Sequence, residues 1–393
     1  MLDNINKIVH GDRKFFASSL PGLSLSGLFP KHDLKDVFPL NKPHAEYFYN
    51  ARSAIYTLAE LWELKGKEVL FPSYCCGVDL NALLAAGVVP KIYQVHEGMR
   101  VDASDIRNAI GEKTRAIYLI HYLGFPGPVE ELAALCREKK IYLIEDCALA
   151  LFSRLNGKPL GSFGDAAVFS LYKSLPVPSG GVLVINNGKL TVFPERLSPP
   201  FISTMTHLAS SIEYYINYKD VWLGQKALQL ARTLGRGVKR SVKAKPVVEI
   251  LTDEFDPEVA GYKMSRLSHR IAKAQDPEYI VGRRRENYQY LHELLEQHVV
   301  PVFKELPEGV CPLFYPILLP DNQAAMKSLR ERGVEAWAWW STTHPYLTER
   351  SFPDVEMLRG SVVVIPCHEG LSKKVVERVA NEVVEILKCH QKK

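Results

Sequence analysis

Lys173 lies in a segment that suits covalent chemistry. It follows a predicted strand at residues 166–169 by a few positions, and a loop with two prolines then leads to Gly180 and Gly181. A lysine on such a stiff loop has little conformational freedom, which favours attack of its amine on a carbonyl carbon. A surface lysine in a turn would give the same local pattern, so the segment makes Lys173 a candidate only.

A carboxylate lies 27 residues before this lysine. Asp146 ends an apolar strand predicted at residues 142–144, within the run Ile-Glu-Asp-Cys-Ala that closes at Ala148. A lysine and a carboxylate are the two groups that pyridoxal phosphate needs, because an acid beside the ring nitrogen keeps it protonated and lets the ring accept electrons. The alternative for Asp146 is a simple cap of the next helix.

The phosphate of such a cofactor would need its own site. The run Asn-Ala-Arg-Ser-Ala at residues 50–54 opens a predicted helix, where free amides and the helix dipole favour a dianion. Ser53 offers a hydroxyl and Arg52 a positive charge, and Ser170, three residues before the lysine, offers a second hydroxyl. A serine that merely caps the helix would look the same.

Alternating helix and strand patterns must position these groups. They predict strands at 68–71, 91–95, 116–120, 142–144, 166–169 and 181–185, with helices at 79–86 and 129–139 between them. Such units form a largely parallel sheet covered by helices, whose ligands lie beyond the carboxyl ends of the strands. The candidates follow strands as this requires: Ser73 with Tyr74, His121, Asp146, and residues 170–173.

The composition excludes several classes of protein. The 393 residues are 47% hydrophobic and 24% charged, which is typical of a folded globular chain of about two to three domains. A net charge of +5 is too small to imply a nucleic-acid partner, and no apolar stretch reaches the roughly 20 residues of a membrane span. Seven cysteines without paired metal-site spacing favour a reduced, cytoplasmic protein that holds no metal.

Taken in order, these motifs resemble a known family. The residues that carry the resemblance are, in turn, 70–74, 86–90, 101–102, 113–116, 121–124, 144–148, 157–158, 161–165, 169–170, 180–181, 261–265, 285–287 and 365–368. The pattern is similar to the fold-type-I pyridoxal-phosphate enzymes and, within them, to the DegT/DnrJ/EryC1/StrS aminotransferases, which aminate nucleotide-linked keto sugars. The combined pattern is more specific than any single motif.

The resemblance implies a fold and a set of roles. The fold would be a three-layer α/β/α large domain with a mostly parallel sheet, followed by a smaller α+β C-terminal domain. Lys173 would bond the cofactor's aldehyde and move a proton, Asp146 would pair with the ring nitrogen, and Ser53 and Ser170 would hold the phosphate. The remaining implied positions are Tyr74 or Cys76 against the ring, His121 and Ala148 near the cofactor, and Tyr172, Trp340 and His344 near the substrate.

The sequence also departs from the family pattern. The loop between Ser170 and Lys173 is two residues short, Leu149 stands where a polar contact to the ring hydroxyl is expected, and Gly261 replaces an asparagine that reaches the neighbouring subunit's phosphate. Arg52 could replace that lost contact. The tryptophans at 337, 339 and 340 either stack on a base or sugar or pack in the core, and these alternatives carry equal weight.

The expected protein is therefore a homodimeric aminotransferase that uses an amino-acid donor, such as glutamate, and a keto acceptor. Residues 1–250 would form the cofactor domain, with a variable, partly helical segment at 190–250, and residues 251–393 the smaller domain. The aromatic helix predicted at 210–234, with its basic tail at 232–245, would pack against the partner subunit or the main domain rather than lie on a membrane surface. Two alternatives stay open: a decarboxylase, aldolase or dehydratase reaction on the same cofactor, or a silent cofactor-binding regulator.

Overall fold

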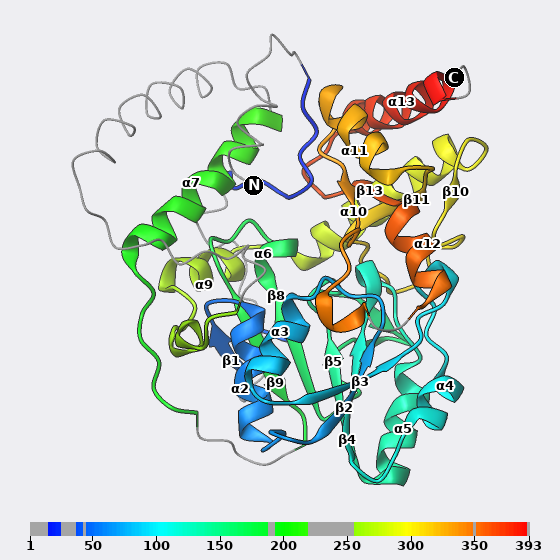
Figure 1. The fold of residues 1–393 in the computed structure, drawn as a ribbon. Coiled ribbons are helices and arrows are strands. Elements are labelled where there is room, and N and C mark those ends of the chain that lie inside the picture. Colours follow the sequence, from blue (N-terminus) through cyan, green and yellow to red (C-terminus); the bar gives the residue numbers. More distant parts are fainter. Residues whose placement is uncertain are drawn as a thin grey trace.

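The computed structural model describes residues 15–24, 37–41, 45–187, 193–218, 255–348 and 351–390. Within these ranges the chain forms a large domain around a seven-stranded sheet and a smaller domain around a four-stranded sheet. Figure 1 shows the smaller domain stacked on the edge of the large one, with the C-terminal helix farthest from the large sheet.

The large sheet has the strand order β1-β9-β8-β5-β4-β2-β3. The central pairs are parallel, whereas β9 runs antiparallel to both β8 and β1. The mostly parallel sheet expected from the sequence is confirmed. Its strands are β1 (Ala45–Phe48), β2 (Glu68–Pro72), β3 (Val89–Tyr93), β4 (Thr114–Ile120), β5 (Tyr142–Asp146), β8 (Ala166–Ser170) and β9 (Gly181–Ile185).

Helices cover both faces of this sheet. The crossover from β2 to β3 runs one way along the strand order, and those from β3 to β4 and β4 to β5 run the other way. Because parallel crossovers are right-handed, α3 must lie on the face opposite α4 and α5. The helices are α2 (Ala51–Leu61), α3 (Val78–Ala85), α4 (Ala103–Ala109) and α5 (Val129–Lys139), and Figure 1 shows α2 beside α3 and α4 beside α5.

The smaller domain is an antiparallel sheet packed against helices. Its strand order is β10-β11-β13-β12, and its buried face carries Ile317, Val363 and Ile365. The strands are β10 (Val300–Pro301), β11 (Phe314–Leu318), β12 (Trp337–Ala338) and β13 (Val362–Pro366), and the helices are α10 (Pro277–Leu295), α11 (Asn322–Glu331), α12 (Pro353–Ser361) and α13 (Lys373–His390).

The residues before two helices differ in their capping. The helix α10 begins at Pro277, where the Asp276 side chain accepts a hydrogen bond from the amide of Tyr279. Asp102 precedes α4, but its carboxylate pairs with Arg100 and makes no capping bond. The strands β1 and β13 and the helix α12 were not predicted.

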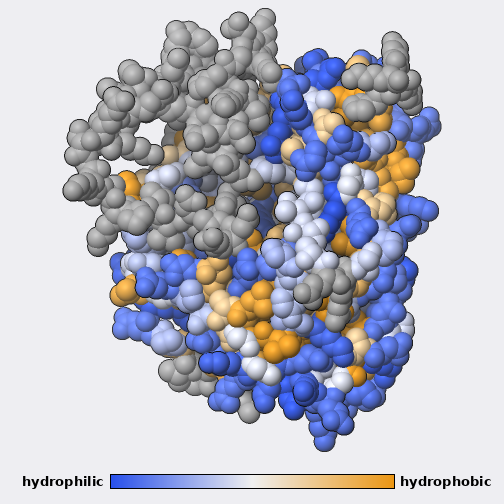
Figure 2. All heavy atoms as spheres, in the orientation of Figure 1, coloured by the Kyte–Doolittle hydropathy of each residue, from blue (hydrophilic) through white to orange (hydrophobic). Residues whose placement is uncertain are grey.

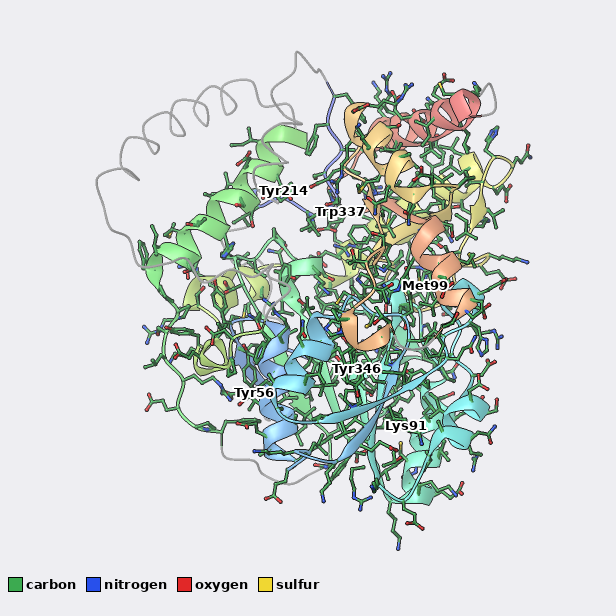
Figure 3. The ribbon with its side chains drawn as sticks, viewed as in Figure 1. Tyr56, Lys91, Met99, Tyr214, Trp337 and Tyr346 are labelled. Atoms are coloured by element: carbon green, nitrogen blue, oxygen red, sulfur yellow. The ribbon has the colours of Figure 1, made fainter. Side chains whose placement is uncertain are left out.

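The helix α7 (Phe201–Tyr218) packs on this chain's own smaller domain. The hydroxyl of Tyr214 lies 3.3 Å from the carboxylate of Glu335, and the amide of Leu23 donates to the carbonyl of Ser211. Figure 3 labels Tyr214 on α7 and Trp337 on β12. The contact of Tyr214 is with the smaller domain and not with the main domain or partner subunit expected, whereas the predicted continuation to residue 234 and the basic tail at 232–245 lie outside the described residues. No helix in the described ranges is long and apolar enough to span a membrane.

The segment that follows residue 255 contacts the edge of the large sheet. It contains η5 (Pro257–Gly261) and α9 (Arg266–Lys273), and the amide of Tyr49 donates to the carbonyl of Tyr262. An isolated bridge also pairs Phe48 with Lys263. The expected domain boundary at residue 250 stays a prediction.

Candidate functional site

The carboxyl ends of β5 and β8 bring Asp146 and Lys173 to one edge of the large sheet. Asp146 is the last residue of β5, and Lys173 lies in the short helix α6 (Leu171–Ser174) directly after β8, the strand that pairs with β5. The Lys173 amine makes no hydrogen bond or ion pair with the described residues. Burial lowers the pKa of this amine, but neighbouring negative groups outweigh burial and raise it above its ordinary value; they are Tyr172, Cys76, Asp146 and Asp79.

Two donors fix the carboxylate of Asp146. The phenol of Tyr118 donates to Oδ2 at 2.7 Å, and the amide of Ala148 donates to Oδ1 at 2.8 Å. Tyr118 comes from β4, the strand beside β5, and is fully buried. Burial, followed by the charge of Asp146, raises the pKa of Tyr118 well above its usual range, so the phenol keeps its proton and remains a donor. Both donors favour the ionised carboxylate.

A glycine lets the start of α2 approach the same edge. Gly181 pairs with Ser170 on one side and with Phe48 on the other, and a Cβ on Gly181 would lie 2.3 Å from the Asn50 carbonyl and 2.6 Å from the Ala51 amide. The first amides of α2 therefore lie beside the end of β8. Ser170 is the N-cap of α6 but makes no capping hydrogen bond, so its hydroxyl is available to a ligand.

Ser53 is oriented differently from the expected phosphate ligand. Asn50 is the N-cap of α2, and its Oδ1 accepts both the amide of Ser53 at 2.9 Å and its hydroxyl at 3.1 Å. The hydroxyl proton of Ser53 is thus used within the helix cap. Helix geometry leaves the amides of Ala51 and Arg52 without an intrahelical acceptor. Arg52 itself is buried in this first turn.

Of the two residues expected against the cofactor ring, Cys76 is the one whose titration is coupled to that of Lys173. Burial, the largest effect, raises the pKa of the Cys76 thiol to about 12. Tyr74 is fully buried, and its hydroxyl donates to the Trp339 carbonyl at 2.9 Å. Tyr74 therefore packs in the core beneath the smaller domain, which leaves Cys76 as the candidate.

His121 is fully buried in a structural network. Its Nε2 lies 3.1 Å from Glu145, and its Nδ1 accepts the amide of Gly127. Glu145 also accepts three backbone amides, from residues 161, 163 and 164. Both ring nitrogens of His121 are engaged, which favours the alternative of a hydrogen-bonded loop histidine over a cofactor ligand. The Sγ of Cys147 lies close enough to complete a metal-ligand triad, but the amides already occupy Glu145.

The smaller domain contributes residues 337–344 over the loop that follows β2. The Trp340 ring lies 5.3 Å from the ring of Tyr74, and Nε2 of His344 lies 3.0 Å from the Asn81 side chain. A Cβ atom added to Gly77 would lie only 2.9 Å from Cδ2 of His344, so the two residues pack closely. The buried guanidinium of Arg359 joins the two segments through carbonyls on both, namely those of Ser73, Cys75, Trp340 and Thr342.

All three tryptophans of this segment are half-buried. Trp339 packs on Phe314 and stacks on Trp340, and Trp337 lies under the guanidinium of Arg330. Core packing therefore accounts for part of each ring. The proposed contact of Trp340, His344 and Tyr172 with substrate stays a prediction.

The sequence interpretation missed one buried acid in this region. Asp79, the second residue of α3, is 4% exposed, and its Oδ1 accepts the amide of Leu80 and lies 3.6 Å from Sγ of Cys76. Burial and then Asp146 raise the pKa of Asp79 to about 6. Its place six residues after Ser73, near the carboxyl end of β2, is the sequence signal that could have marked it.

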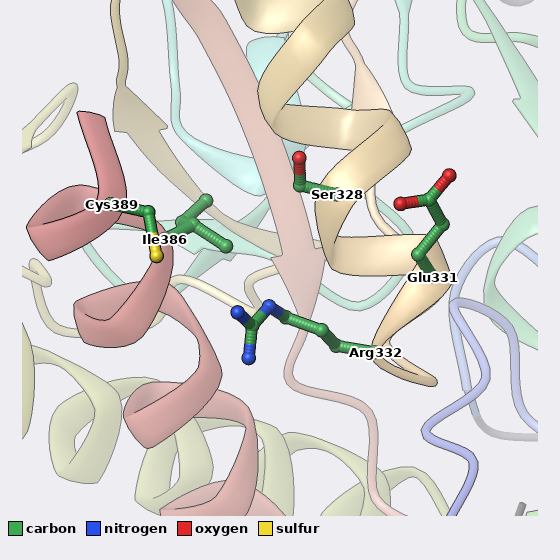
Figure 4. A pocket seen from close by; sticks show the side chains of 5 residues that line it. All are labelled: Ser328, Glu331, Arg332, Ile386 and Cys389. Atoms are coloured by element: carbon green, nitrogen blue, oxygen red, sulfur yellow. The ribbon is translucent and has the colours of Figure 1, made fainter. Parts of the chain in front are cut away.

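A separate pocket lies between α11 and α13, away from Lys173. It has a volume of about 300 Å³ and is lined by Ser328, Glu331, Arg332, Ile386 and Cys389 (Figure 4). Arg332 is paired there with Glu382 at 3.0 Å. The pocket holds none of the residues discussed above.

The comparisons with known proteins agree with this arrangement. Residues 40–198, which contain the Lys173 site, match the profile of the DegT/DnrJ/EryC1/StrS aminotransferase family. Over these residues the chain is similar to this family. Its members use pyridoxal 5'-phosphate as their cofactor.

Two curated relatives in the family are sugar-nucleotide enzymes. The chain is similar to a GDP-perosamine synthase of Vibrio cholerae, with 31% identity over 39% of this chain and 42% of the relative. It is also similar to a dTDP-4-dehydro-2,3,6-trideoxy-D-glucose 4-aminotransferase of Saccharopolyspora spinosa, with 26% identity over 88% of this chain and 86% of the relative. The first match is thus confined to less than half of either chain, whereas the second spans nearly all of both.

Solved structures show the same fold. The Helicobacter pylori aminotransferase PseC, described as acting in pseudaminic acid biosynthesis, superposes with a TM-score of 0.67 at 18% identity and covers 96% of this chain and all of its own. A putative sugar aminotransferase of Streptococcus pneumoniae, solved in a PLP form, gives a TM-score of 0.65 at 14% identity over 99% of this chain and 97% of its own. At these identities the likeness concerns the fold alone.

The residues present fit the family's cofactor. Three groups lie at the sheet edge where Gly181 leaves room for the start of α2. They are the Lys173 amine, which has no hydrogen bond to the described residues, the Asp146 carboxylate, which two donors hold, and the Ser170 hydroxyl, which makes no capping bond. These are an amine for the aldehyde, an acid for the ring nitrogen, and a hydroxyl with helix amides for the phosphate. Leu149 is buried and apolar, as the sequence indicated, so it offers no polar contact to the ring hydroxyl.

Proposed function

We propose that the protein transfers the amino group of an amino acid, glutamate in the first instance, to the keto group of a nucleotide-linked sugar. The observation that carries this proposal is the meeting of Lys173 and Asp146 at one sheet edge, in a chain that is similar to the aminotransferase family over residues 40–198. The names of the two curated relatives support the class of acceptor.

Each residue has a distinct task in this proposal. When bound, the cofactor supplies the electron sink that lets a substrate carbon lose its proton. Asp146, held by Tyr118 and Ala148, keeps a proton on the cofactor's ring nitrogen. Lys173 would hold the cofactor through its aldehyde, and its amine would act as the base and acid that moves a proton at the substrate carbon.

The phosphate end of the site would be held without a contact from Ser53. The Ser170 hydroxyl and the first amides of α2 are the available donors. Gly261 stands where the family pattern has an asparagine that contacts the phosphate. Arg52 is proposed to replace that contact with its positive charge. A protein with Arg52→Ala that binds the cofactor as tightly as the parent would end this part of the proposal.

The acceptor class can be tested with the purified full chain. The enzyme is incubated with cofactor, glutamate and one keto compound at a time, and amine products are identified by mass spectrometry. We expect product with keto sugars linked to dTDP, GDP or UDP, and little with the same sugars lacking the nucleotide. Product from small keto acids alone would contradict the nucleotide-sugar assignment while leaving amino transfer in place.

We also propose that the protein is a cytoplasmic homodimer. Large apolar side chains are exposed beside Gly261, with Leu197 at 69% and Phe201 at 79%, and the amide of Leu197 donates to the Gly261 carbonyl. Such exposed side chains support a subunit contact at the position where the family is expected to meet its neighbour. Light scattering should give about twice the chain mass, and Phe201→Glu should shift it toward the monomer.

The cytoplasmic location is supported by seven free cysteines.

A further inference from the structure

A short segment of the smaller domain lies over the sheet edge of the proposed site. In this segment, residues 340–342, which we call the cover segment, the Trp340 ring packs on two tyrosines of the large domain. Its centroid lies 5.3 Å from that of Tyr74, which follows β2, and 5.8 Å from that of Tyr122, which follows β4. The strand β4 pairs with β5, whose last residue is Asp146. The cover segment therefore lies over strand ends next to the one that carries Asp146.

The cover segment is fixed at both of its flanks. Before it, the amide of Trp339 donates to the carbonyl of Val362 on β13 at 3.0 Å. After it, Nε2 of His344 lies 3.0 Å from the side chain of Asn81 on α3. A movement confined to the cover segment would therefore leave the sheets of both domains unchanged.

Trp340 has an unfavourable backbone conformation. Its φ of 44° lies in the left-handed region, where the Cβ of any residue other than glycine is crowded. Glycine would adopt this conformation without that cost. The chain has a tryptophan here instead, and its ring makes the contacts with the two tyrosines. Strain of this kind persists only where other contacts hold it, and it is common in segments that switch between two conformations.

Arg359 provides the contacts that hold the cover segment. This arginine on α12 is 6% exposed, and its Nη1 donates to the carbonyl of Trp340 and, at 2.6 Å, to that of Thr342. Its Nη2 donates to the carbonyl of Ser73 in the loop after β2 at the longer distance of 3.4 Å. Hydrogen bonds from a charged donor are stronger than those between neutral groups. Arg359 is thus the main restraint on the cover segment.

This arrangement leaves two buried donors without acceptors. Nε of Arg359 and Nε1 of Trp339 are buried and make no hydrogen bond with the described residues. Each such donor costs free energy that contact with water would restore. The strain of Trp340 adds a third cost at the same place. Movement of the cover segment away from the sheet edge would relieve that strain and admit water, so an alternative conformation lies close in free energy.

We propose that the cover segment is a gate over the sheet edge, held closed by Arg359 as a positioning residue and opened when the carbonyls of Trp340 and Thr342 leave its guanidinium. This inference rests on the proposed function, because the edge beneath the gate is the one assigned to pyridoxal phosphate. In the closed form the Trp340 ring stays on its two tyrosines. In the open form a ligand can enter or leave, so the gate changes the rates of entry and exit more than the affinity.

The rates of cofactor entry and exit test the gate. The full-length apoprotein with Arg359→Met is compared with the parent and with Arg332→Met, an arginine of the same domain that pairs with Glu382 away from the site. Visible absorbance follows the uptake of pyridoxal phosphate and its loss after dilution. We expect both rates to rise about threefold or more in Arg359→Met, with the affinity within about twofold of the parent's. Arg332→Met should behave like the parent.

A purely structural role of Arg359 predicts a different result. Loss of an arginine that only joined the domains would loosen the site, so cofactor exit would become faster, entry would not, and the affinity would fall. That result, or rates equal to those of the parent, would overturn the gate. Arg359→Lys keeps a charged donor and should restore the parent rates in part, and it is the variant to use if Arg359→Met does not fold.

The fluorescence of Trp340 gives a second readout that needs no cofactor. Quenching by acrylamide is measured, and the contribution of Trp340 is its difference from Trp340→Phe. We expect this contribution to be quenched about twofold more strongly in Arg359→Met, because the open gate exposes the ring. The remaining tryptophans, measured in the double variant, should be quenched as in Trp340→Phe alone. Stronger quenching of all tryptophans would show a general loosening of the fold and would contradict a gate.

The outcomes separate this inference from the function on which it rests. A parent protein that binds no pyridoxal phosphate would refute the proposed function, and the quenching of Trp340 would still decide whether the cover segment opens. A parent that binds the cofactor and reacts with glutamate, together with rates and quenching that Arg359→Met leaves unchanged, would refute only the gate.

Discussion

At the scale of single residues, the carboxylate of Asp146 depends on a phenol from the neighbouring strand. Tyr118→Phe removes the 2.7 Å hydrogen bond and leaves one oxygen of a buried carboxylate without its donor. We expect the free energy of unfolding to fall by about 1–3 kcal/mol, as measured by urea denaturation. We also expect cofactor affinity to fall about fivefold or more, equivalent to ~1 kcal/mol, because Asp146 is then less firmly oriented.

The matched control is Tyr93→Phe. Tyr93 is also buried, but its hydroxyl donates to a neutral acceptor, the Tyr118 carbonyl at 2.9 Å. The Tyr93→Phe protein should lose about 1 kcal/mol in the free energy of unfolding and keep its cofactor affinity. Equal effects of the two variants on cofactor affinity would contradict the role given to Tyr118.

The raised pKa of Asp79 predicts how stability depends on pH. Its value of about 6 in the folded apoprotein exceeds the ordinary 3.8, so the folded state binds the proton more tightly than the unfolded state. This group therefore stabilises the fold below about pH 4, and that contribution is lost as the pH rises to about 6. At pH 8 the ionised Asp79 costs about 3 kcal/mol by this reasoning.

Asp79→Asn should consequently make the apoprotein more stable at pH 8, by up to that amount. The gain should shrink steadily as the pH falls from 6 to 4, which urea denaturation at several pH values can follow. A variant less stable than the parent at pH 8, or a difference independent of pH, would show that Asp79 is not strained by its charge.

Residues next to a strand end were predictable, and residues that act across strands were not. The local sequence was enough to identify Lys173, Asp146 and Ser170 as candidates, because each lies at or just after the end of a strand that is recognisable as an apolar run. Tyr118 acts on Asp146, 28 positions away, and only the pairing of β4 with β5 brings the two together. Ser53 was expected to bind the phosphate, because the sequence pattern does not show that the Asn50 side chain accepts the hydrogen bond of the Ser53 hydroxyl.

At the scale of elements, the close approach of β9 and α2 builds the phosphate end of the site. Gly181→Ala would place a Cβ 2.3 Å from backbone atoms of Asn50, so the start of α2 must move. We expect a loss of about 1–3 kcal/mol in the free energy of unfolding and weaker cofactor binding, since the helix amides move away from Ser170.

Gly282→Ala is the control for this change. Gly282 is exposed within α10, and a Cβ there would meet nothing within 4 Å. The same substitution should leave cofactor binding unchanged and stabilise the helix by up to about 1 kcal/mol. If Gly181→Ala binds the cofactor as well as Gly282→Ala does, α2 does not contribute to the phosphate site.

Element types were predictable where apolar periodicity is long or flanked by clear stops. The central strands and α5 therefore agree closely with the structure. The strand β1 is only four residues long and half-buried, so it carries little pattern of its own and forms because β9 offers an antiparallel edge. The strand β13 is a short apolar run between Ser361 and Pro366, so its signal was present in the sequence and was missed.

At the scale of the whole molecule, a buried arginine of the smaller domain donates a hydrogen bond to the large domain next to Lys173. Arg284 on α10 is 1% exposed, and its Nε donates to Glu369 at 2.8 Å while its Nη2 donates to the carbonyl of Ser174 at 2.8 Å. Arg284→Met leaves Glu369 without its partner and frees the short helix that carries Lys173. We expect a loss of about 3–5 kcal/mol in the free energy of unfolding and faster cofactor loss on dialysis.

The exposed pair Lys388–Glu385 on α13 provides the comparison. Lys388→Met should change stability by less than about 1 kcal/mol and leave cofactor retention as it is, because water screens this pair. An Arg284→Met protein as stable as Lys388→Met would mean that the domains hold Lys173 in place without this contact.

The two-domain architecture followed from the order of motifs, but the way the domains meet did not. The domains are joined by side chains that donate hydrogen bonds to backbone carbonyls far away in the sequence. Arg359 donates to the loop after β2, and Tyr346 donates to the Pro90 carbonyl (Figure 3). No local sequence pattern predicts a contact of this kind. The surface is equally uninformative, because polar and charged residues predominate on the described part of the face in Figure 2, with apolar patches between them.

The measurement that tests the central claim most directly is the absorbance spectrum of the purified full chain with pyridoxal phosphate. The account predicts a visible band that borohydride removes, that Lys173→Ala lacks, and that glutamate bleaches. A protein without such a band, or a band that persists in Lys173→Ala, would contradict the assignment of this sheet edge as the cofactor site.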